Sequence, residues 1–206
     1  MILARTRAAD AAQNGSPTTS SRILSAGAQL FREQTYAQAT TRELSSRLGI
    51  TNGSLYYHVA NKEDLLYKIC LESLARVTTA VTAAVEAETD PLAKVRAIFD
   101  AHLGSVLSDL DLHATMLFEL RSLTGERRTE VQAARDTYQA LVTSVVAGAQ
   151  KDGSLRSDLS AKHLTLGLLS LLNWVISWYD PAGSMAPGKL ADMFWEMFAN
   201  GAVPRG

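Results

Sequence analysis

Apolar side chains recur three or four residues apart along most of this chain beyond residue 17. That spacing places them on one face of an α-helix, whereas a half-buried β-strand would alternate apolar and polar residues. Ile23, Leu30 and Phe31 show the helical pattern near the start, and no segment alternates strongly enough to indicate a strand. The sequence therefore predicts an all-α fold.

Local start and stop signals divide the chain into about nine helices. Pro91 and Pro187 each suit the first turn of a helix, where the N–H that proline lacks has no helical partner. Gly49 and Gly201 each follow a helical run and are expected to end it. The expected helices cover about residues 18–34, 40–48, 51–58, 61–88, 91–107, 112–122, 127–151, 160–179 and 187–200.

Two short helices joined by a glycine-containing turn are expected within residues 40–58. Thr40 and Glu43 have the spacing of a capping box, which pairs free amides at a helix N-terminus. Gly49 then ends the first helix and Thr51 caps the second. A turn of three to four residues containing glycine is typical of the helix-turn-helix, whose second helix enters the DNA major groove. The segment is therefore predicted to bind DNA.

The distribution of charge supports this prediction. Residues 1–62 contain seven basic and three acidic residues, a balance of +4, and the remainder contains 13 basic and 18 acidic residues, a balance of −5. The two parts add up to the net charge of −1. A basic N-terminal third on an acidic remainder indicates that only this end meets a polyanion.

Cys70 is the only cysteine, so neither an intrachain disulfide nor a cysteine-rich zinc site is possible, which fits a reducing compartment. The first residues lack the apolar core of a secretory signal, and no apolar run approaches the roughly 18 residues that span a bilayer. We expect a cytoplasmic protein without membrane contact. No motif indicates a metal or a cofactor.

Residues 20–66 resemble the N-terminal signature of the TetR family of repressors. The resemblance rests on the segments TTREL (40–44), LGITNGSLYYHV (48–59) and NKEDLL (61–66). Thr35, Ser45 and Val59 depart from the family, which usually has glycine, alanine and phenylalanine there. The resemblance implies a flexible basic arm over residues 1–17, a three-helix DNA-binding head over 18–66, and a helical ligand-binding and dimerisation body over 67–206.

The resemblance also implies roles for single residues of the head. Those expected to touch phosphate, the groove or the DNA backbone are Thr40, Arg42, Thr51, Asn52, Gly53, Ser54, Tyr56, Tyr57, His58 and Lys62. Thr40 and Thr51 have a second interpretation as caps alone. Tyr56 has a second interpretation as a core residue, because Leu55 and Val59 lie on the side that faces the first helix.

Residues 172–183 resemble the C-terminal pattern of a TetR subgroup that controls fatty-acid or steroid catabolism. This resemblance implies an acyl-CoA thioester or a similar lipid-like inducer. Trp174 and Trp178 would stack on such a ligand or pack in the protein. Arg121 would hold an anionic group or belong to a solvated basic patch. The other residues predicted to line a pocket between the middle helices, or a plain core, are Phe99, His102, Leu103, Val106, Met116, Leu117, Leu120, Tyr138 and Leu141.

The helix expected over residues 160–179 is apolar nearly all round, which indicates burial on all sides. We expect it to form a four-helix homodimer interface with the last helix, because groove-reading heads normally work in two-fold pairs. A buried monomer core is the other interpretation. The predicted interface residues are Leu164, Leu168, Leu171, Leu172, Val175, Phe194 and Phe198.

The sequence thus predicts a ligand-responsive transcription regulator. The expected form is a homodimer that represses from operator DNA and is released by a small hydrophobic or acyl-CoA-type effector. A structural DNA-binding protein without a ligand is one alternative. An all-α enzyme is another, but the four histidines are scattered and no metal motif, Gly-rich loop or nucleophile elbow occurs, so no catalytic residue is expected.

Overall fold

The computed structural model describes residues 18–202. Its α-helices are α2 (Thr19–Gln38), α3 (Thr41–Leu48), α4 (Asn52–His58), α5 (Lys62–Ala87), α6 (Pro91–Ser108), α7 (Leu110–Glu119), α8 (Gly125–Asp152), α9 (Ala161–Trp174) and α10 (Pro187–Ala202). Two short 3₁₀ helices are η1 (Leu120–Ser122) and η2 (Val175–Ser177). Nine α-helices and no strand over these residues confirm the predicted all-α fold. The arm predicted for residues 1–17 lies outside the described residues.

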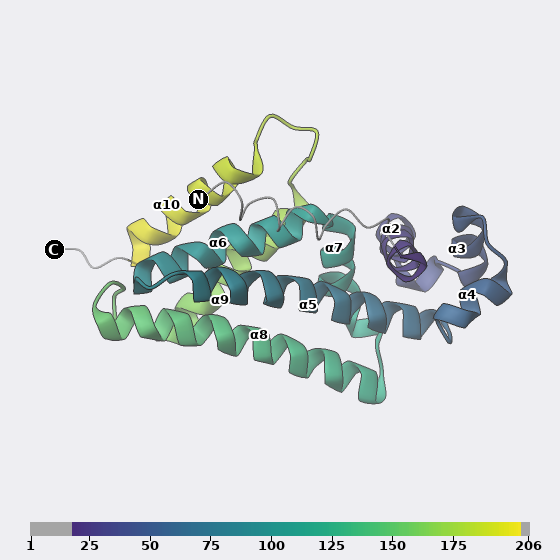
Figure 1. The fold of residues 1–206 in the computed structure, drawn as a ribbon, viewed down its shortest axis with the longest axis horizontal. Coiled ribbons are helices and arrows are strands. Elements are labelled where there is room, and N and C mark those ends of the chain that lie inside the picture. Colours follow the sequence, from purple (N-terminus) through teal and green to yellow (C-terminus); the bar gives the residue numbers. More distant parts are fainter. Residues whose placement is uncertain (1–17, 203–206) are drawn as a thin grey trace, which may run out of the picture.

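The molecule is elongated, with α3 and α4 at one end and α10 at the other (Figure 1). Helix α5 starts beside α4 and runs along the body between α6 and α8 (Figure 1). No helix among residues 18–202 is both long enough and apolar enough to cross a bilayer. Because α5 belongs to both ends, it is the continuous element that joins them.

The predicted caps of the two short helices are confirmed. Thr40 Oγ1 accepts from the Glu43 amide at 3.2 Å, and Thr51 Oγ1 accepts from the Ser54 amide at 3.1 Å. Gly49 follows α3 with a φ of 66°, in the left-handed region that glycine tolerates. The side chain of Glu43 does not complete the capping box, because its Oε1 accepts from Gln34 and Arg47 instead.

The first helix is longer than predicted. The expected end lies at about residue 34, but helical bonding continues to Gln38 across a kink at Thr35. The φ of 72° and ψ of 155° at Thr35 fall in a region that only glycine enters readily. The kink therefore occurs at residue 35, the position at which the family usually has glycine.

Two clusters of buried side chains form the core. The head cluster includes Ile23, Leu44, Leu55 and Leu66 and continues into the body through Leu112 of α7. The body cluster joins helices α5 to α10. Because the head cluster contains α7 residues, the head packs directly against the body, in addition to being joined to it by the chain.

The predicted dimer-interface residues require correction. Five of them are buried in the chain's own core: Leu164, Leu168, Leu172, Val175 and Phe194. Leu171 and Phe198 are half-buried and pack against the same core. An apolar face that already packs on α6 and α8 is not available to a second subunit. The exposed stripe of α9 lies on its other side, where Leu166 is 40% and Trp174 62% exposed.

Candidate DNA interface and effector chamber

Helix α4 presents its N-terminal residues to solvent. Thr51, Asn52, Gly53 and Ser54 are all exposed, while the fully buried Leu55 anchors the opposite face. Hydroxyl, amide and backbone N–H groups at an exposed helix N-terminus can donate to phosphate oxygens and base edges. The contact of these four residues with DNA stays a prediction.

The three side chains at the end of α4 differ in their surroundings. Tyr57 is 88% exposed, and the edge of its ring meets His58 with 5.3 Å between centroids. Tyr56 is 49% exposed, and its hydroxyl lies 3.1 Å from Thr41 Oγ1, which ties α4 to α3. Tyr56 therefore has both a structural contact and a surface that DNA can reach. His58 is half-buried.

Asn52 and Lys62 have structural contacts that the sequence did not reveal. The Ser45 hydroxyl donates to Asn52 Oδ1 at 2.6 Å. Lys62 Nζ donates to the backbone carbonyls of Tyr36, Ala37 and Ala39 at 2.9, 3.3 and 3.0 Å. These bonds use all three ammonium donors and fasten the end of α2 to α5. The phosphate contact of Lys62 stays a prediction, as do those of the exposed Thr40 and Arg42.

The end of α4 is fastened to the body at Asp64. This carboxylate accepts from the Ala60 amide at 2.9 Å and pairs with Lys68 at 2.9 Å and with Arg127 of α8 at 3.3 Å. Lys68 Nζ also donates to the carbonyl of His58 at 2.7 Å. The position of the DNA-facing helix thus depends on both α5 and α8.

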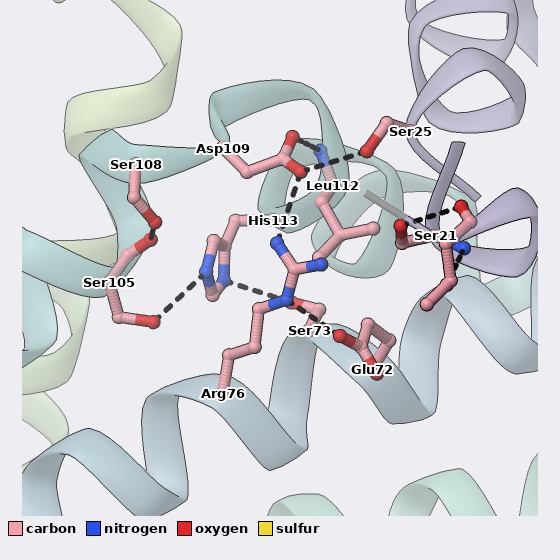
Figure 2. A network of polar contacts seen from close by, with 11 residues as sticks. Ser21, Ser25, Glu72, Ser73, Arg76, Ser105, Ser108, Asp109, Leu112 and His113 are labelled. Atoms are coloured by element: carbon pink, nitrogen blue, oxygen red, sulfur yellow. Dashed lines mark hydrogen bonds and ion pairs between the residues drawn. The ribbon is translucent and has the colours of Figure 1, made fainter. Parts of the chain in front are cut away.

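A second polar network joins the head to α7 (Figure 2). Asp109, at the start of α7, lies 3.3 Å from Arg76 of α5 and accepts from Ser25 of α2 at 3.5 Å. One turn further along α7, the His113 ring nitrogens lie 2.9 Å from Ser73 Oγ and 3.3 Å from Ser105 Oγ (Figure 2). Helix α7 therefore contacts the head at one side and the body interior at the other.

The body contains an inner chamber of about 80 Å³ lined by residues of α5, α6, α7, α8 and α9 and open to solvent at the exposed Gln132 and Asp136. Its lining residues are Leu74, Val77, His102, His113, Met116, Leu117, Gln132, Arg135, Asp136, Tyr138, Gln139, Leu169 and Asn173. His102 lies between two polar neighbours, with Nδ1 2.6 Å from the Tyr138 hydroxyl and Nε2 3.1 Å from Asn173 Oδ1. Burial lowers the pKa of His102 to about 3 and that of His113 to about 4, so both rings are neutral at pH 7.

An outer hollow of about 430 Å³ opens beside this chamber. Its lining residues are Leu117, Phe118, Arg135, Gln139, Leu166, Leu169, Ser170, Asn173, Trp174 and Ile176. Five of them, namely Leu117, Arg135, Gln139, Leu169 and Asn173, also line the inner chamber. The two spaces therefore share part of one wall.

Two family models match the chain. The model for bacterial regulatory proteins of the tetR family matches residues 23–69, and the model for the tetracyclin repressor-like C-terminal domain matches residues 88–202. The chain belongs to the TetR family. It is a DNA-binding transcription regulator and not an enzyme, so the alternative of an all-α enzyme is set aside.

Individual TetR proteins resemble the chain over most of its length. The HTH-type transcriptional repressor KstR2 of Rhodococcus jostii is 26% identical over 181 residues, 87% of this chain and 88% of KstR2. The structure of PfmR from Thermus thermophilus has a TM-score of 0.81 at 29% identity, covering 87% of this chain and 97% of PfmR. AibR, solved in complex with isovaleryl coenzyme A and operator DNA, has a TM-score of 0.77 at 24% identity, covering 86% of this chain and 96% of AibR.

The structure separates the predicted ligand-binding residues of this TetR protein into two groups. Four line the inner chamber, namely His102, Met116, Leu117 and Tyr138, and Trp174 lines the outer hollow together with Leu117. The other seven line neither of these two spaces: Phe99, Leu103, Val106, Leu120, Arg121, Leu141 and Trp178. Phe99, Leu103 and Val106 are buried in the packed core, where Phe99 meets Trp195 and Phe198 edge-on or tilted.

The sequence analysis missed the polar wall of the chamber. Gln132, Arg135, Asp136 and Gln139 lie at i, i+3, i+4 and i+7 of α8 and form one stripe. That spacing was a readable signal, but a polar stripe on a helix usually faces solvent. In the structure Gln132 and Asp136 are exposed and Arg135 and Gln139 are half-buried, so the stripe forms the solvent-facing side of the chamber.

Proposed function

We propose that this TetR protein is a homodimeric repressor whose operator binding is released by an acyl-CoA-type effector. The observation that carries the proposal is that one helix, α5, both lines the inner chamber with Leu74 and Val77 and fastens α4 through Asp64. A ligand in the chamber therefore meets the same element that holds the DNA-facing helix. A chamber and a hollow in the body favour an effector sensor over a structural DNA-binding protein.

The contacts on α7 provide a parallel connection from chamber to head. His113 and Met116 line the chamber, while Thr115 Oγ1 donates to the carbonyl of Ala28 in α2 at 3.2 Å. Arg32 of α2 donates to the carbonyl of Ile176 at 2.9 Å. A ligand that displaces α7 or η2 would move α2. The effector then favours the arrangement of heads that does not fit the operator, and a differential affinity of a few kcal/mol is enough to change operator occupancy.

For the thioester class, we rely on the resemblance of residues 172–183 and on the bound isovaleryl coenzyme A of AibR, which shows that this fold can hold a thioester. For the homodimer, we rely on the exposed stripe of Leu166, Ser170 and Trp174 on α9. This stripe borders the outer hollow, so a second subunit placed there would cover the hollow's open side.

The test is binding of the purified protein to DNA from its own promoter region at stated salt, with and without a panel of acyl-CoA thioesters. Salt-dependent, sequence-specific binding that one thioester releases supports the whole proposal. Specific binding that no thioester releases would keep the regulator and remove the thioester from the proposal.

A further inference from the structure

We infer that Glu119, the last residue of α7, is a positioning residue for operator binding. Its carboxylate holds the backbone of α2 just beyond the kink, where the chain continues into the helix-turn-helix. The inference rests on the proposed function. It adds a residue of the body through which the position of α7 reaches α3 without passing through α5.

The kink turns one backbone amide of α2 toward α7. The ψ of Thr35 is 155°, far from the helical value of about −42°. The peptide group that follows Thr35 therefore leaves the helical direction. Its N–H, which belongs to Tyr36, donates to Glu119 Oε1 at 3.2 Å. A side chain 83 positions further along the chain thus caps the residues beyond the kink.

Residues 36–39 form a short segment between the kink and α3. Two of the four residues are exposed, one is half-buried and only Ala39 is buried, so burial of apolar surface contributes little to holding the segment. Polar contacts hold it instead. Glu119 accepts from its first N–H, and Lys62 Nζ donates to three of its carbonyls. The position of this segment therefore depends on α7 and α5 together.

The segment leads directly into the helix-turn-helix. It is followed at once by Thr40, whose hydroxyl caps α3 by accepting from the Glu43 amide. At the first residue of α3, the Thr41 hydroxyl lies 3.1 Å from the hydroxyl of Tyr56 in α4. A displacement of residues 36–39 is therefore passed to α3, and from α3 to the DNA-facing helix.

Helix α7 bonds to the backbone of α2 on both sides of the kink. Thr115 Oγ1 donates to the carbonyl of Ala28 before the kink at 3.2 Å, and Glu119 accepts from Tyr36 beyond it. Between Thr115 and Glu119, Met116 lines the inner chamber. A shift of α7 therefore acts on the segment beyond the kink through the bond to Glu119.

The bond between Glu119 and Tyr36 lies at the edge of a cleft. This space of about 340 Å³ separates part of α2 from α7 and η2, and both Thr35 and Glu119 line it. Among residues 18–202, no basic nitrogen lies within 4 Å of the Glu119 carboxylate to form an ion pair. The carboxylate therefore has room to leave the amide when α7 moves, and no ion pair opposes that movement.

Operator affinity tests the role of Glu119. The experiment measures the anisotropy of labelled DNA from the protein's own promoter region at fixed salt. Glu119→Ala removes the acceptor and should weaken binding about tenfold, the low end for a hydrogen bond to a charged group, because the carboxylate is only half-buried. Glu119→Gln keeps an acceptor oxygen and should bind within about twofold of the parent. Parent-like affinity in Glu119→Ala, or an equal loss in Glu119→Gln, would overturn the inference.

A matched variant separates positioning from stability. Thr115→Val removes the other bond from α7 to the backbone of α2, at a buried residue and with nearly the same side-chain shape. Urea unfolding should show lower stability for both Thr115→Val and Glu119→Ala. Only Glu119→Ala should lose operator affinity, because the bond lost in Thr115→Val lies before the kink. An equal loss of affinity in the two variants would contradict a special role for the contact at the kink.

Amide hydrogen exchange of the full-length protein tests the connection to the body. Coupling between two sites is reciprocal, so saturating operator DNA on the head should slow exchange of the α7 amides in the parent and in Glu119→Gln, but not in Glu119→Ala. Unchanged α7 exchange in the parent would refute the connection. A parent that binds no promoter DNA specifically would overturn the proposed function and this inference with it, whereas a Glu119→Ala protein that behaves like the parent would overturn this inference alone.

Discussion

The Ser45 hydroxyl donates to Asn52 Oδ1 across 2.6 Å, from a side chain that is only 5% exposed. The bond joins α3 to the first residue of α4 and holds the Oδ1 side of the Asn52 amide toward α3. A hydroxyl at residue 45, where the family usually has alanine, thus fixes the presentation of a predicted DNA contact. We expect Ser45→Ala to weaken operator binding about fivefold, since a neutral hydrogen bond contributes about 1 kcal/mol.

Fluorescence anisotropy on labelled operator at fixed salt measures this loss. The matched control is Ser46→Ala, on the exposed side of the same helix, which should bind like the parent. Equal affinities for Ser45→Ala and the parent would show that Asn52 is oriented without the bond.

Tyr57 is the most exposed large hydrophobic side chain among the described residues of the head, at 88%. Tyr57→Ala should therefore change the free energy of unfolding by less than about 0.5 kcal/mol. The same change should weaken operator binding at least tenfold, because the ring lies on the predicted DNA face. Urea unfolding and anisotropy, measured on one preparation, separate the two effects. An unaltered operator affinity would count against the assigned DNA face.

Thr35 holds a backbone conformation that a side chain disfavours, with a φ of 72°. We expect Thr35→Gly to raise the free energy of unfolding by about 1 kcal/mol, because relief of the strain exceeds the added entropy of the unfolded chain. Thr35→Ala retains the Cβ and should give no such gain. If both variants unfold at the same urea concentration as the parent, the kink is not strained.

His102 and His113 make stability depend on pH. Burial holds the folded-state pKa values at about 3 and about 4, below the ordinary value near 6.5. The unfolded chain therefore binds more protons, and the free energy of unfolding falls as the pH drops below about 6.5 toward the folded-state values. Each histidine contributes a slope of about 1.4 kcal/mol per pH unit in that window.

Urea unfolding at pH 7, 6 and 5 measures this slope. His113→Asn should reduce it by about half, while His163→Asn, at an exposed residue, should leave it unchanged. An unchanged slope in His113→Asn would show that the ring is protonated equally in both states.

The exposed stripe of α9 is the predicted contact with a second subunit. Leu166→Glu should yield monomers that remain folded, since Leu166 is 40% exposed. Leu168→Asp places a charge in the core, where Leu168 is fully buried, and should unfold the chain. Sedimentation measures the mass and circular dichroism the fold. A persistent Leu166→Glu dimer would place the interface elsewhere.

The features that were predicted correctly from the sequence are helix starts and ends, which depend on local interactions. Caps at Thr40 and Thr51 and the stop at Gly49 depend on neighbouring residues alone, and all three are present. The kink at Thr35 was missed because threonine carries no signal for a positive φ. The Lys62 contacts with the end of α2 were missed because they join residues more than 20 positions apart.

The body was harder to predict for a physical reason. The spacing of apolar residues shows that a helix has an apolar face, but it does not show whether the same chain or a second subunit covers that face. Core residues of α9 such as Leu168 were therefore assigned to a dimer interface. The same ambiguity placed Phe99 in a pocket when it packs in the core. His102 and Tyr138 line the chamber, and their bond to each other depends on how α6 packs against α8, which periodicity does not report.

The continuity of α5 has a mechanical consequence. Between Lys62 and Val77 it contains neither glycine nor proline. We therefore expect this segment of α5 to move as one rigid helix. Leu74 lies twelve residues from Lys62, a lever arm of about 18 Å at 1.5 Å per residue. A tilt of about 5° at the chamber then carries the head end of the helix by about 1.5 Å. Hydrogen bonds span only about 2.7–3.2 Å, so a ligand that rotates this helix by a few degrees would be enough to break the proposed contacts between α4 and base edges.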